Sequence, residues 1–167
     1  YDMVIHRDLV FAELGGETLM LDLFLPTDVS PPHPVILYVK GGAFRQFDRR
    51  DTAQQWIVRH GFAFASIDHR LSPNHHFPAQ LEDCKAAVRW LRANSETYGL
   101  DPTRIGAWGT SSGGHLVSLL GTTGSVADFD TGPNLAFSSE VQAVCSSHGS
   151  TDLRAFIEER GIPADDS

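Results

Sequence analysis

The segment that constrains the fold most strongly is G-T-S-S-G at residues 109–113. An apolar run (RIGAW, residues 104–108) precedes it, and a helix pattern follows from His115. A strand that turns so abruptly into a helix brings its backbone into close contact, and glycines at both flanking positions remove the Cβ atoms that would clash. The central serine is then held in a strained conformation with its hydroxyl above the sheet. The pattern predicts Ser111 as an exposed nucleophile.

The competing interpretation of this segment is a glycine-rich turn of the kind that binds phosphate. Its spacing matches neither G-x-G-x-x-G nor a Walker motif, and no lysine follows the glycines. A helix N-terminus carries a positive partial charge, and the amide of Ser112 lies at that end of the predicted helix. We therefore favour a nucleophile whose developing oxyanion is bound by the Ser112 amide.

Short apolar runs alternate with helix patterns along the chain. Strands are predicted at residues 19–24, 35–39, 62–67, 104–108 and 141–146, and helices at residues 52–59, 78–99, 115–120 and 153–160. This alternation is typical of a doubly wound, mostly parallel α/β sheet, whose ligand site lies beyond the carboxyl ends of the strands. The chain has no repeat or linker, so we expect a single domain over residues 1–167.

A second glycine segment, K-G-G-A-F at residues 40–44, follows the predicted strand 35–39. Small residues let backbone amides approach a substrate carbonyl, and each such donor to a tetrahedral intermediate is worth about 10²–10³ in rate. An ordinary glycine turn is the alternative. Residues 68–73 and 109–114 also follow predicted strands, so we expect all three segments at one edge of the sheet and favour an oxyanion loop.

Together these segments resemble the bacterial carboxylesterases of the hormone-sensitive-lipase and feruloyl/acetyl-esterase type. K-G-G-A-F is similar to the family's HGG[GA][FW] motif, and D-H-R-L-S-P at residues 68–73 is similar to D-Y-R-L-[SA]-P. Further matches are LMLDLFLP (19–26), F-P-A-Q (77–80), D-P-T-R-I (101–105), G-T-S-S-G-G-H-L (109–116) and G-S-T-D-L (149–153). The likeness covers nearly the whole chain.

The resemblance implies an α/β-hydrolase fold with an eight-stranded sheet and a Ser-His-Asp triad. Such a site hydrolyses carboxylic esters, here small acyl or aryl esters, without a cofactor or a metal. The resemblance places the nucleophile at Ser111 and the oxyanion-hole donors at the amides of Gly42, Ala43 and Ser112.

Three positions depart from the family pattern: Lys40 replaces His, His69 replaces Tyr, and Ser112 replaces Ala. A lysine side chain has only donors, so Lys40 cannot accept a hydrogen bond as an imidazole can. The sequence does not reveal which residue braces this end of the oxyanion loop.

The base and the acid are the parts of the triad that the sequence does not clearly provide. In this family they come after the seventh and eighth strands, yet only His115 and His148 follow Ser111, and about six of the eight strands are predicted. We therefore expect the domain to lack the C-terminal strands that carry the family's acid and base. A fragment, a truncated gene product and a natural minimal hydrolase with a rebuilt triad are the three explanations.

For a rebuilt triad, the candidate base is His148 and the candidate acid is Asp152. His148 lies just past a strand that should neighbour the nucleophile strand, and Asp152 is close to it in sequence. The alternative for each is a structural polar residue. We expect His115, on the helix behind the turn, to be a structural hydrogen-bonding residue.

Composition and charge argue against several kinds of partner and site. The formal net charge of −8 argues against nucleic acid, and no apolar run approaches the roughly 20 residues that span a bilayer. Cys84 and Cys145 fall short of a disulfide framework and are expected to be buried free thiols, and no Cys/His cluster has metal-site spacing. We expect a cytoplasmic protein, with secretion after signal removal as the alternative.

A sheet without its last strands exposes an apolar edge. We expect this edge to pair with a second copy of the chain, as a homodimer, or with a missing C-terminal segment. Within the same fold, an arylformamidase or a peptidase is the related alternative. A non-catalytic binding domain, or an inactive fragment, is the alternative of a different class.

Overall fold

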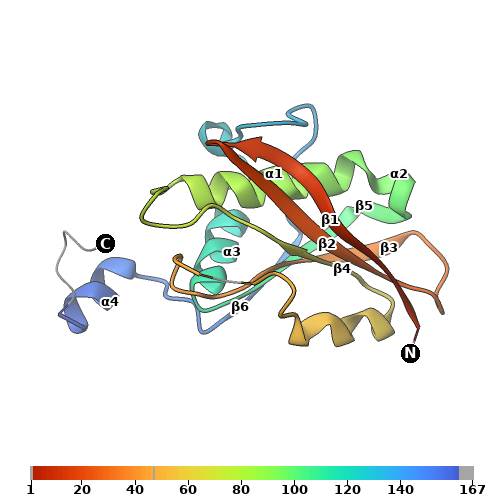
Figure 1. The fold of residues 1–167 in the computed structure, drawn as a ribbon, viewed down its shortest axis with the longest axis horizontal. Helices are drawn as coiled ribbons and strands as arrows, with labels where there is room; N and C mark the ends of the chain where they lie inside the picture. The colour runs from red at the N-terminus through yellow and green to blue at the C-terminus, as the bar shows by residue number, and fades with distance from the viewer. Residues whose placement is uncertain (1, 47, 162–167) are drawn as a thin grey trace.

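A single six-stranded sheet forms the centre of the computed structural model, which describes residues 2–46 and 48–161. The strand order across the sheet is β1-β2-β4-β3-β5-β6 (Figure 1). The strands are β1 (Met3–Leu14), β2 (Glu17–Pro26), β3 (His33–Val39), β4 (Ala63–Ile67), β5 (Leu100–Thr110) and β6 (Ala143–Ser147). β1 and β2 form an antiparallel hairpin, and β2 is antiparallel to β4. The strands β4, β3, β5 and β6 are parallel to one another. The expected α/β-hydrolase sheet is confirmed.

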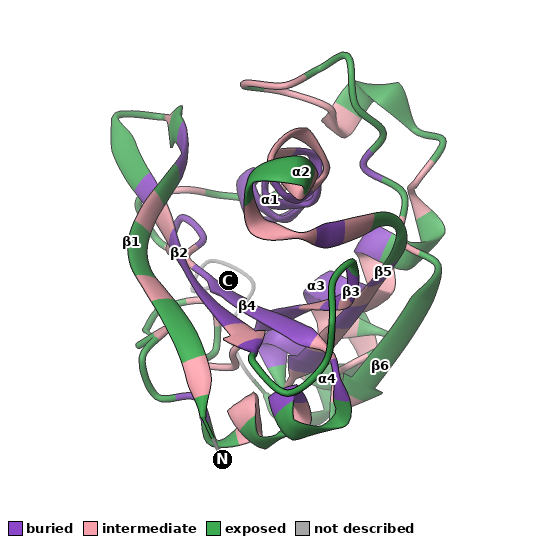
Figure 2. Cartoon of the chain, turned by 90° about the vertical axis from the view of Figure 1, so that its right-hand side faces the viewer, coloured by how far each residue is buried: buried purple, intermediate pink, exposed green. Residues whose placement is uncertain are grey.

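Helices cover the two faces of the sheet unequally. Successive strand residues face opposite sides, so Leu37 of β3 packs in a large core with α1 (Ala79–Ala93) and α3 (Ser112–Thr122). Tyr38 packs on the other side, in a smaller core with the 3₁₀ helix η1 (Ala53–His60). Figure 2 shows burial concentrated in α1 and the central strands, whereas β1 and β6 are largely exposed. The short helices are α2 (Ser95–Tyr98), η2 (Ala127–Phe129) and α4 (Leu153–Glu159).

Several local predictions need correction. The helix expected over residues 78–99 is interrupted at Asn94, whose side-chain amide donates to the carbonyl of Trp90 at 2.9 Å, and Gly99 ends the short α2 instead. The helix predicted at residues 52–59 is a 3₁₀ helix. Cys84 is buried as expected, but Cys145 is exposed, because it lies on the edge strand β6. Pairing of this edge with another strand stays a prediction.

Candidate active site

Ser111 lies at the turn between β5 and α3. Its φ of 53° and ψ of −121° define a conformation that costs a non-glycine residue about 1–3 kcal/mol. A Cβ at Gly109 would lie 2.2 Å from the carbonyl oxygen of Gly113, and a Cβ at Gly113 would lie 2.0 Å from that of Val39. The amide of Ser111 donates to the carbonyl of Ser147 at 2.8 Å, and the residue is exposed. Backbone contact therefore requires both glycines, and the turn presents the serine to solvent.

The loop at residues 40–44 packs directly against this turn. A Cβ at Gly41 would lie 2.6 Å from the carbonyl oxygen of Thr110 and 2.8 Å from the Cβ of Ser111. Further along the loop, Ala43 and Phe44 have φ values of 53° and 61°, in the left-handed region that L-residues rarely adopt. The loop thus reaches the nucleophile in a conformation that its surroundings must hold.

The amides of this loop are hydrogen-bonded to the hydroxyls on either side of the nucleophile. Gly41 N–H donates to Thr110 Oγ1 at 3.2 Å, and Gly42 N–H donates to Ser112 Oγ at 3.1 Å. The Gly42 amide is one of the predicted oxyanion donors, and in this structure a neutral hydroxyl accepts from it. Two of the predicted donors, Gly42 and Ser112, are therefore brought together.

Three further contacts hold the outer side of the loop. Lys40, which stands where the family has His, forms an ion pair with Asp51. The carbonyl of Phe44 accepts from the amide of Ser72 at 2.9 Å, and the Phe44 ring packs edge-on against His115 with centroids 6.0 Å apart. The loop is therefore held by the Asp51 carboxylate, which pairs with Lys40, and by the Ser72 amide, which donates to the carbonyl of Phe44.

The segment at residues 68–73 is anchored by a buried ion-pair cluster. Arg70 Nε donates to Asp83 at 2.9 Å, and Arg70 Nη2 donates to Glu82 at 2.9 Å, both on α1. His69 is buried, which lowers the pKa of its imidazole, and its Nδ1 lies 3.0 Å from the carbonyl oxygen of Arg70. Through Ser72, this anchored segment supports the loop at residues 40–44.

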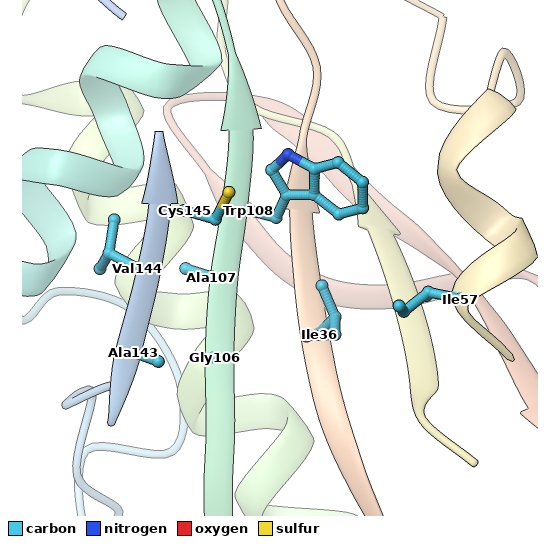
Figure 3. A pocket seen from close by; sticks show the side chains of 8 residues that line it. All are labelled: Ile36, Ile57, Gly106, Ala107, Trp108, Ala143, Val144 and Cys145. Atoms are coloured by element: carbon cyan, nitrogen blue, oxygen red, sulfur yellow. The ribbon is translucent and has the colours of Figure 1, made fainter. Parts of the chain in front are cut away.

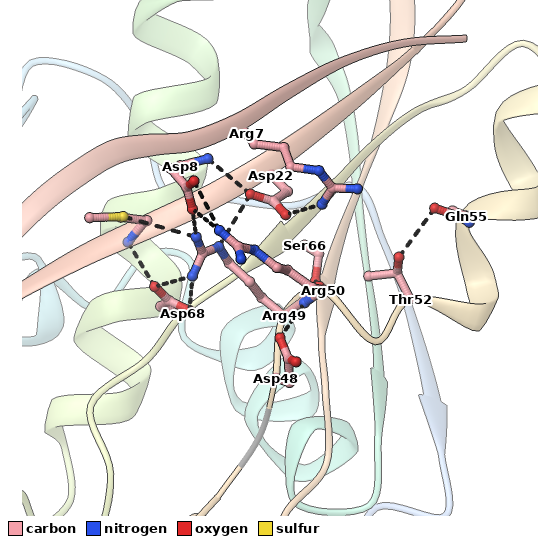
Figure 4. Close-up of polar contacts among 11 residues, drawn as sticks. Arg7, Asp8, Asp22, Asp48, Arg49, Arg50, Thr52, Gln55, Ser66 and Asp68 are labelled. Carbon is pink, nitrogen blue, oxygen red and sulfur yellow. Dashed lines mark hydrogen bonds and ion pairs between the residues drawn. The ribbon is translucent and has the colours of Figure 1, made fainter. Parts of the chain in front are cut away.

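A second charge cluster fixes the chain that follows the oxyanion loop. Arg49 lies among three carboxylates, at 3.3 Å from Asp22 and 3.2 Å from Asp68, and it also pairs with Asp8 (Figure 4). The Asp22 side chain is fully buried and also accepts from Arg7 at 2.6 Å. The cluster joins β1, β2 and the residue after β4 to the segment that carries Arg49. Because each carboxylate already has a guanidinium partner, we assign the cluster a structural role.

The predicted base and acid lie nearby in sequence but are not joined to the nucleophile. His148 follows Ser147, whose carbonyl accepts from Ser111, and its φ is 59°. Among the described residues, neither His148 nor His115 forms a hydrogen bond with the Ser111 hydroxyl, and His115 Nδ1 lies 2.7 Å from the carbonyl oxygen of Ser150. The Asp152 carboxylate accepts from the amide of Ala155 at 2.9 Å and caps α4.

Two depressions in the surface lie away from Ser111. An apolar one of about 210 Å³ lies on the η1 side of the sheet, between Ile57 and the strands β3, β5 and β6, with Trp108 at its upper end (Figure 3). A polar one of about 300 Å³ lies beside Arg49 and Asp68. Ser111 lines neither of them, so neither identifies the acyl or alcohol pocket.

Within residues 2–46 and 48–161, no group of three or more His, Cys, Asp or Glu side chains is arranged to hold a metal ion. None of the helices described is long and apolar enough to cross a membrane.

The sequence predicted Ser111, Gly42, Ala43 and Ser112 as site residues, but it gave no indication of the side chains that hold the loop in place. Thr110 could have been found, because both variable positions of G-T-S-S-G carry hydroxyls. The pairing of Lys40 with Asp51 is a tertiary contact, and no local pattern in the sequence indicates it.

Comparisons with known proteins agree with this geometry. A model of the BD-FAE family matches residues 21–166. Esterase LipC of Mycobacterium tuberculosis is 32% identical over 148 residues, which cover 86% of this chain and 36% of LipC. A bifunctional GH43-CE protein of Bacteroides eggerthii superimposes with a TM-score of 0.80 and 38% identity, over 89% of this chain and 23% of that one.

A truncated carbohydrate esterase from gut microbiota superimposes with a TM-score of 0.79 and 30% identity, covering 87% of this chain and 56% of its own. The chain spans about a third of the length of the curated relatives LipC and LipQ (36% and 34%).

Proposed function

Because the chain belongs to the BD-FAE family, we propose that it carries the nucleophile and the oxyanion hole of a serine carboxylesterase acting on small acyl or aryl esters. The observation that carries this proposal is the contact between loop 40–44 and the turn at Ser111. The exposed serine, the N-terminus of α3 and two consecutive loop amides meet at one point of the sheet edge. The names of the esterase relatives support the same chemistry.

In the proposed reaction, Ser111 Oγ attacks the ester carbonyl carbon while a base takes its proton. The carbonyl π electrons move to oxygen, and the resulting oxyanion accepts from the amides of Gly42, Ala43 and Ser112. The tetrahedral intermediate collapses, the alcohol leaves with the proton, and an acyl-enzyme remains. Water then attacks the acyl carbon by the same route and releases the acid. No step needs a metal or a cofactor.

The base is proposed separately, because no histidine is bonded to Ser111 among the described residues. His148 is the candidate within this chain, since it directly follows the residue that accepts from the Ser111 amide. A histidine of a longer parent protein is the competing proposal. The absence of a histidine contact among the described residues also favours a second function, that of a non-catalytic binding domain.

Hydrolysis of p-nitrophenyl acetate separates these proposals. We expect the turnover seen with the wild-type chain to fall to background in Ser111→Ala. The control is Ser118→Ala, which removes a hydroxyl within α3 and should retain turnover. If His148 is the base, His148→Gln loses about 10³-fold or more. Ser111-dependent turnover that survives in His148→Gln contradicts that assignment. Absence of turnover in the wild-type chain contradicts esterase activity of this chain and favours the binding domain.

A further inference from the structure

The two residues that flank the nucleophile each direct a hydroxyl at the oxyanion loop. Thr110 Oγ1 accepts from Gly41 N–H at 3.2 Å and also lies 3.3 Å from the Tyr38 hydroxyl. Ser112 Oγ accepts from Gly42 N–H at 3.1 Å, and Ser112 is buried. Both bonds therefore run from the amides of the loop to side chains next to Ser111.

The loop needs support at this point. Ala43 and Phe44 occupy the left-handed region without being glycine, so the loop keeps its shape only while neighbouring groups hold it. The end of the loop at Phe44 is held by a hydrogen bond from the Ser72 amide to the Phe44 carbonyl. The hydroxyls of Thr110 and Ser112 hold the other end, and they do so at the nucleophile itself.

We propose that Ser112, assisted by Thr110, is a positioning residue whose hydroxyl holds the Gly42 amide in the orientation that the oxyanion needs. This inference rests on the proposed function, in which Gly42 is an oxyanion donor. A bond between amide and hydroxyl is neutral, whereas a bond to an oxyanion is charge-assisted and roughly twice as strong. The oxyanion therefore replaces the hydroxyl as acceptor in the transition state, and the donor is already aimed when the charge develops.

The first test measures the Gly42 amide itself and needs no catalysis. In Ser112→Ala, we expect hydrogen exchange at the Gly42 amide, followed by NMR, to become about five- to tenfold faster. Thr110→Val should accelerate exchange at Gly41 in the same way. Ser118→Ala is the matched control, because its hydroxyl bonds to the Gly114 carbonyl within α3. Unchanged Gly42 exchange in Ser112→Ala overturns the proposal.

The second test measures binding of phenylboronic acid, which forms a tetrahedral adduct through an Oγ–B bond to serine, with release of a proton to water. We expect the affinity to fall about five- to tenfold in Ser112→Ala, to recover in Ser112→Thr, and to stay unchanged in Ser118→Ala. Tighter binding in Ser112→Ala means that the hydroxyl only competes for the amide, and overturns the positioning role. Wild-type protein that binds no boronate contradicts the proposed function instead, independently of the exchange result.

Discussion

The nucleophile turn and the β6–α4 region lie side by side, but they are built very differently. At the turn, backbone atoms approach so closely that Gly109 and Gly113 cannot carry a Cβ, and residues 112–114 are buried. By contrast, β6 lies at the edge of the sheet (Figure 1) and is mostly exposed, and α4, which follows it, has no buried residue.

This difference separates the parts of the proposed site that are fixed by contact from the parts that are exposed. The proposed nucleophile and oxyanion donors are held by backbone contact and hydroxyl bonds, and the loop that carries the donors is also held by an ion pair; such groups would be preorganised for the proposed reaction. The candidate base His148 is exposed, and the candidate acid Asp152, also exposed, caps a helix. The residues proposed to attack the ester and to bind its oxyanion are thus fixed by direct contacts, whereas those proposed as base and acid are exposed.

The largest expected effect comes from filling the turn. Gly113→Ala puts a Cβ 2.0 Å from the carbonyl oxygen of Val39, so the backbone must move, and we expect a loss of about 3 kcal/mol or more in the free energy of unfolding. In Gly106→Ala, on the preceding strand β5, the new Cβ meets nothing closer than 3.6 Å, and the substitution should cost less than about 1 kcal/mol in the free energy of unfolding. Urea denaturation measures both. Equal costs would contradict the view that the turn is constrained by contact.

The next effect concerns the charge cluster behind the oxyanion loop. Arg49→Met removes the guanidinium shared by Asp8, Asp22 and Asp68, and because Asp22 is fully buried we expect a loss of about 2–3 kcal/mol. Arg154→Met is the control. Its ion pair with Glu158 is exposed and should contribute less than about 0.5 kcal/mol. If Arg49→Met is as stable as the control, the cluster does not fix this segment.

A smaller effect depends on pH. Burial lowers the pKa of His69 below 6.5, although the nearby carboxylates of Asp68 and Asp83 oppose the shift. The unfolded chain therefore takes up a proton first as pH falls below 6.5, so His69 reduces stability progressively toward acid, by at most about 1.4 kcal/mol per pH unit. His33, also buried with a lowered pKa, adds to the same trend.

The substitution His69→Tyr should remove the contribution of His69 to the pH dependence of stability, while an aromatic ring still fills the site. Denaturation midpoints between pH 7 and 5 measure the change. A slope identical to that of wild type would show that His69 is not neutral in the folded protein.

The smallest effect separates the two roles open to Asp152. Asp152→Ala removes the N-cap of α4 and should lower the free energy of unfolding by about 1 kcal/mol, whereas Asp152→Asn retains a side chain that can cap the helix. Because the carboxylate serves the helix, we expect Asp152→Asn to leave the reactivity of Ser111 within about twofold. A loss near 10⁴-fold in this variant would instead assign Asp152 as the acid that orients the base.

Sequence reasoning succeeded where backbone geometry dictates residue type. The glycines around Ser111, the apolar central strands and the helix containing Leu81 and Cys84 follow from steric and burial requirements that any sequence with this fold must meet. It missed β1, whose alternating burial is weak, and the exposure of Cys145, because an apolar run does not reveal that its strand is at an edge. The partner of Lys40 is set by tertiary folding and has no local signal.

The most direct test of the central claim is the intact mass of the protein after incubation with a serine-directed phosphonate. We expect a single adduct on the wild-type chain, mapped by peptide digestion to Ser111 and absent in Ser111→Ala. Failure of the wild-type chain to form an adduct, or an adduct that persists in Ser111→Ala, would contradict a nucleophile preorganised at this turn.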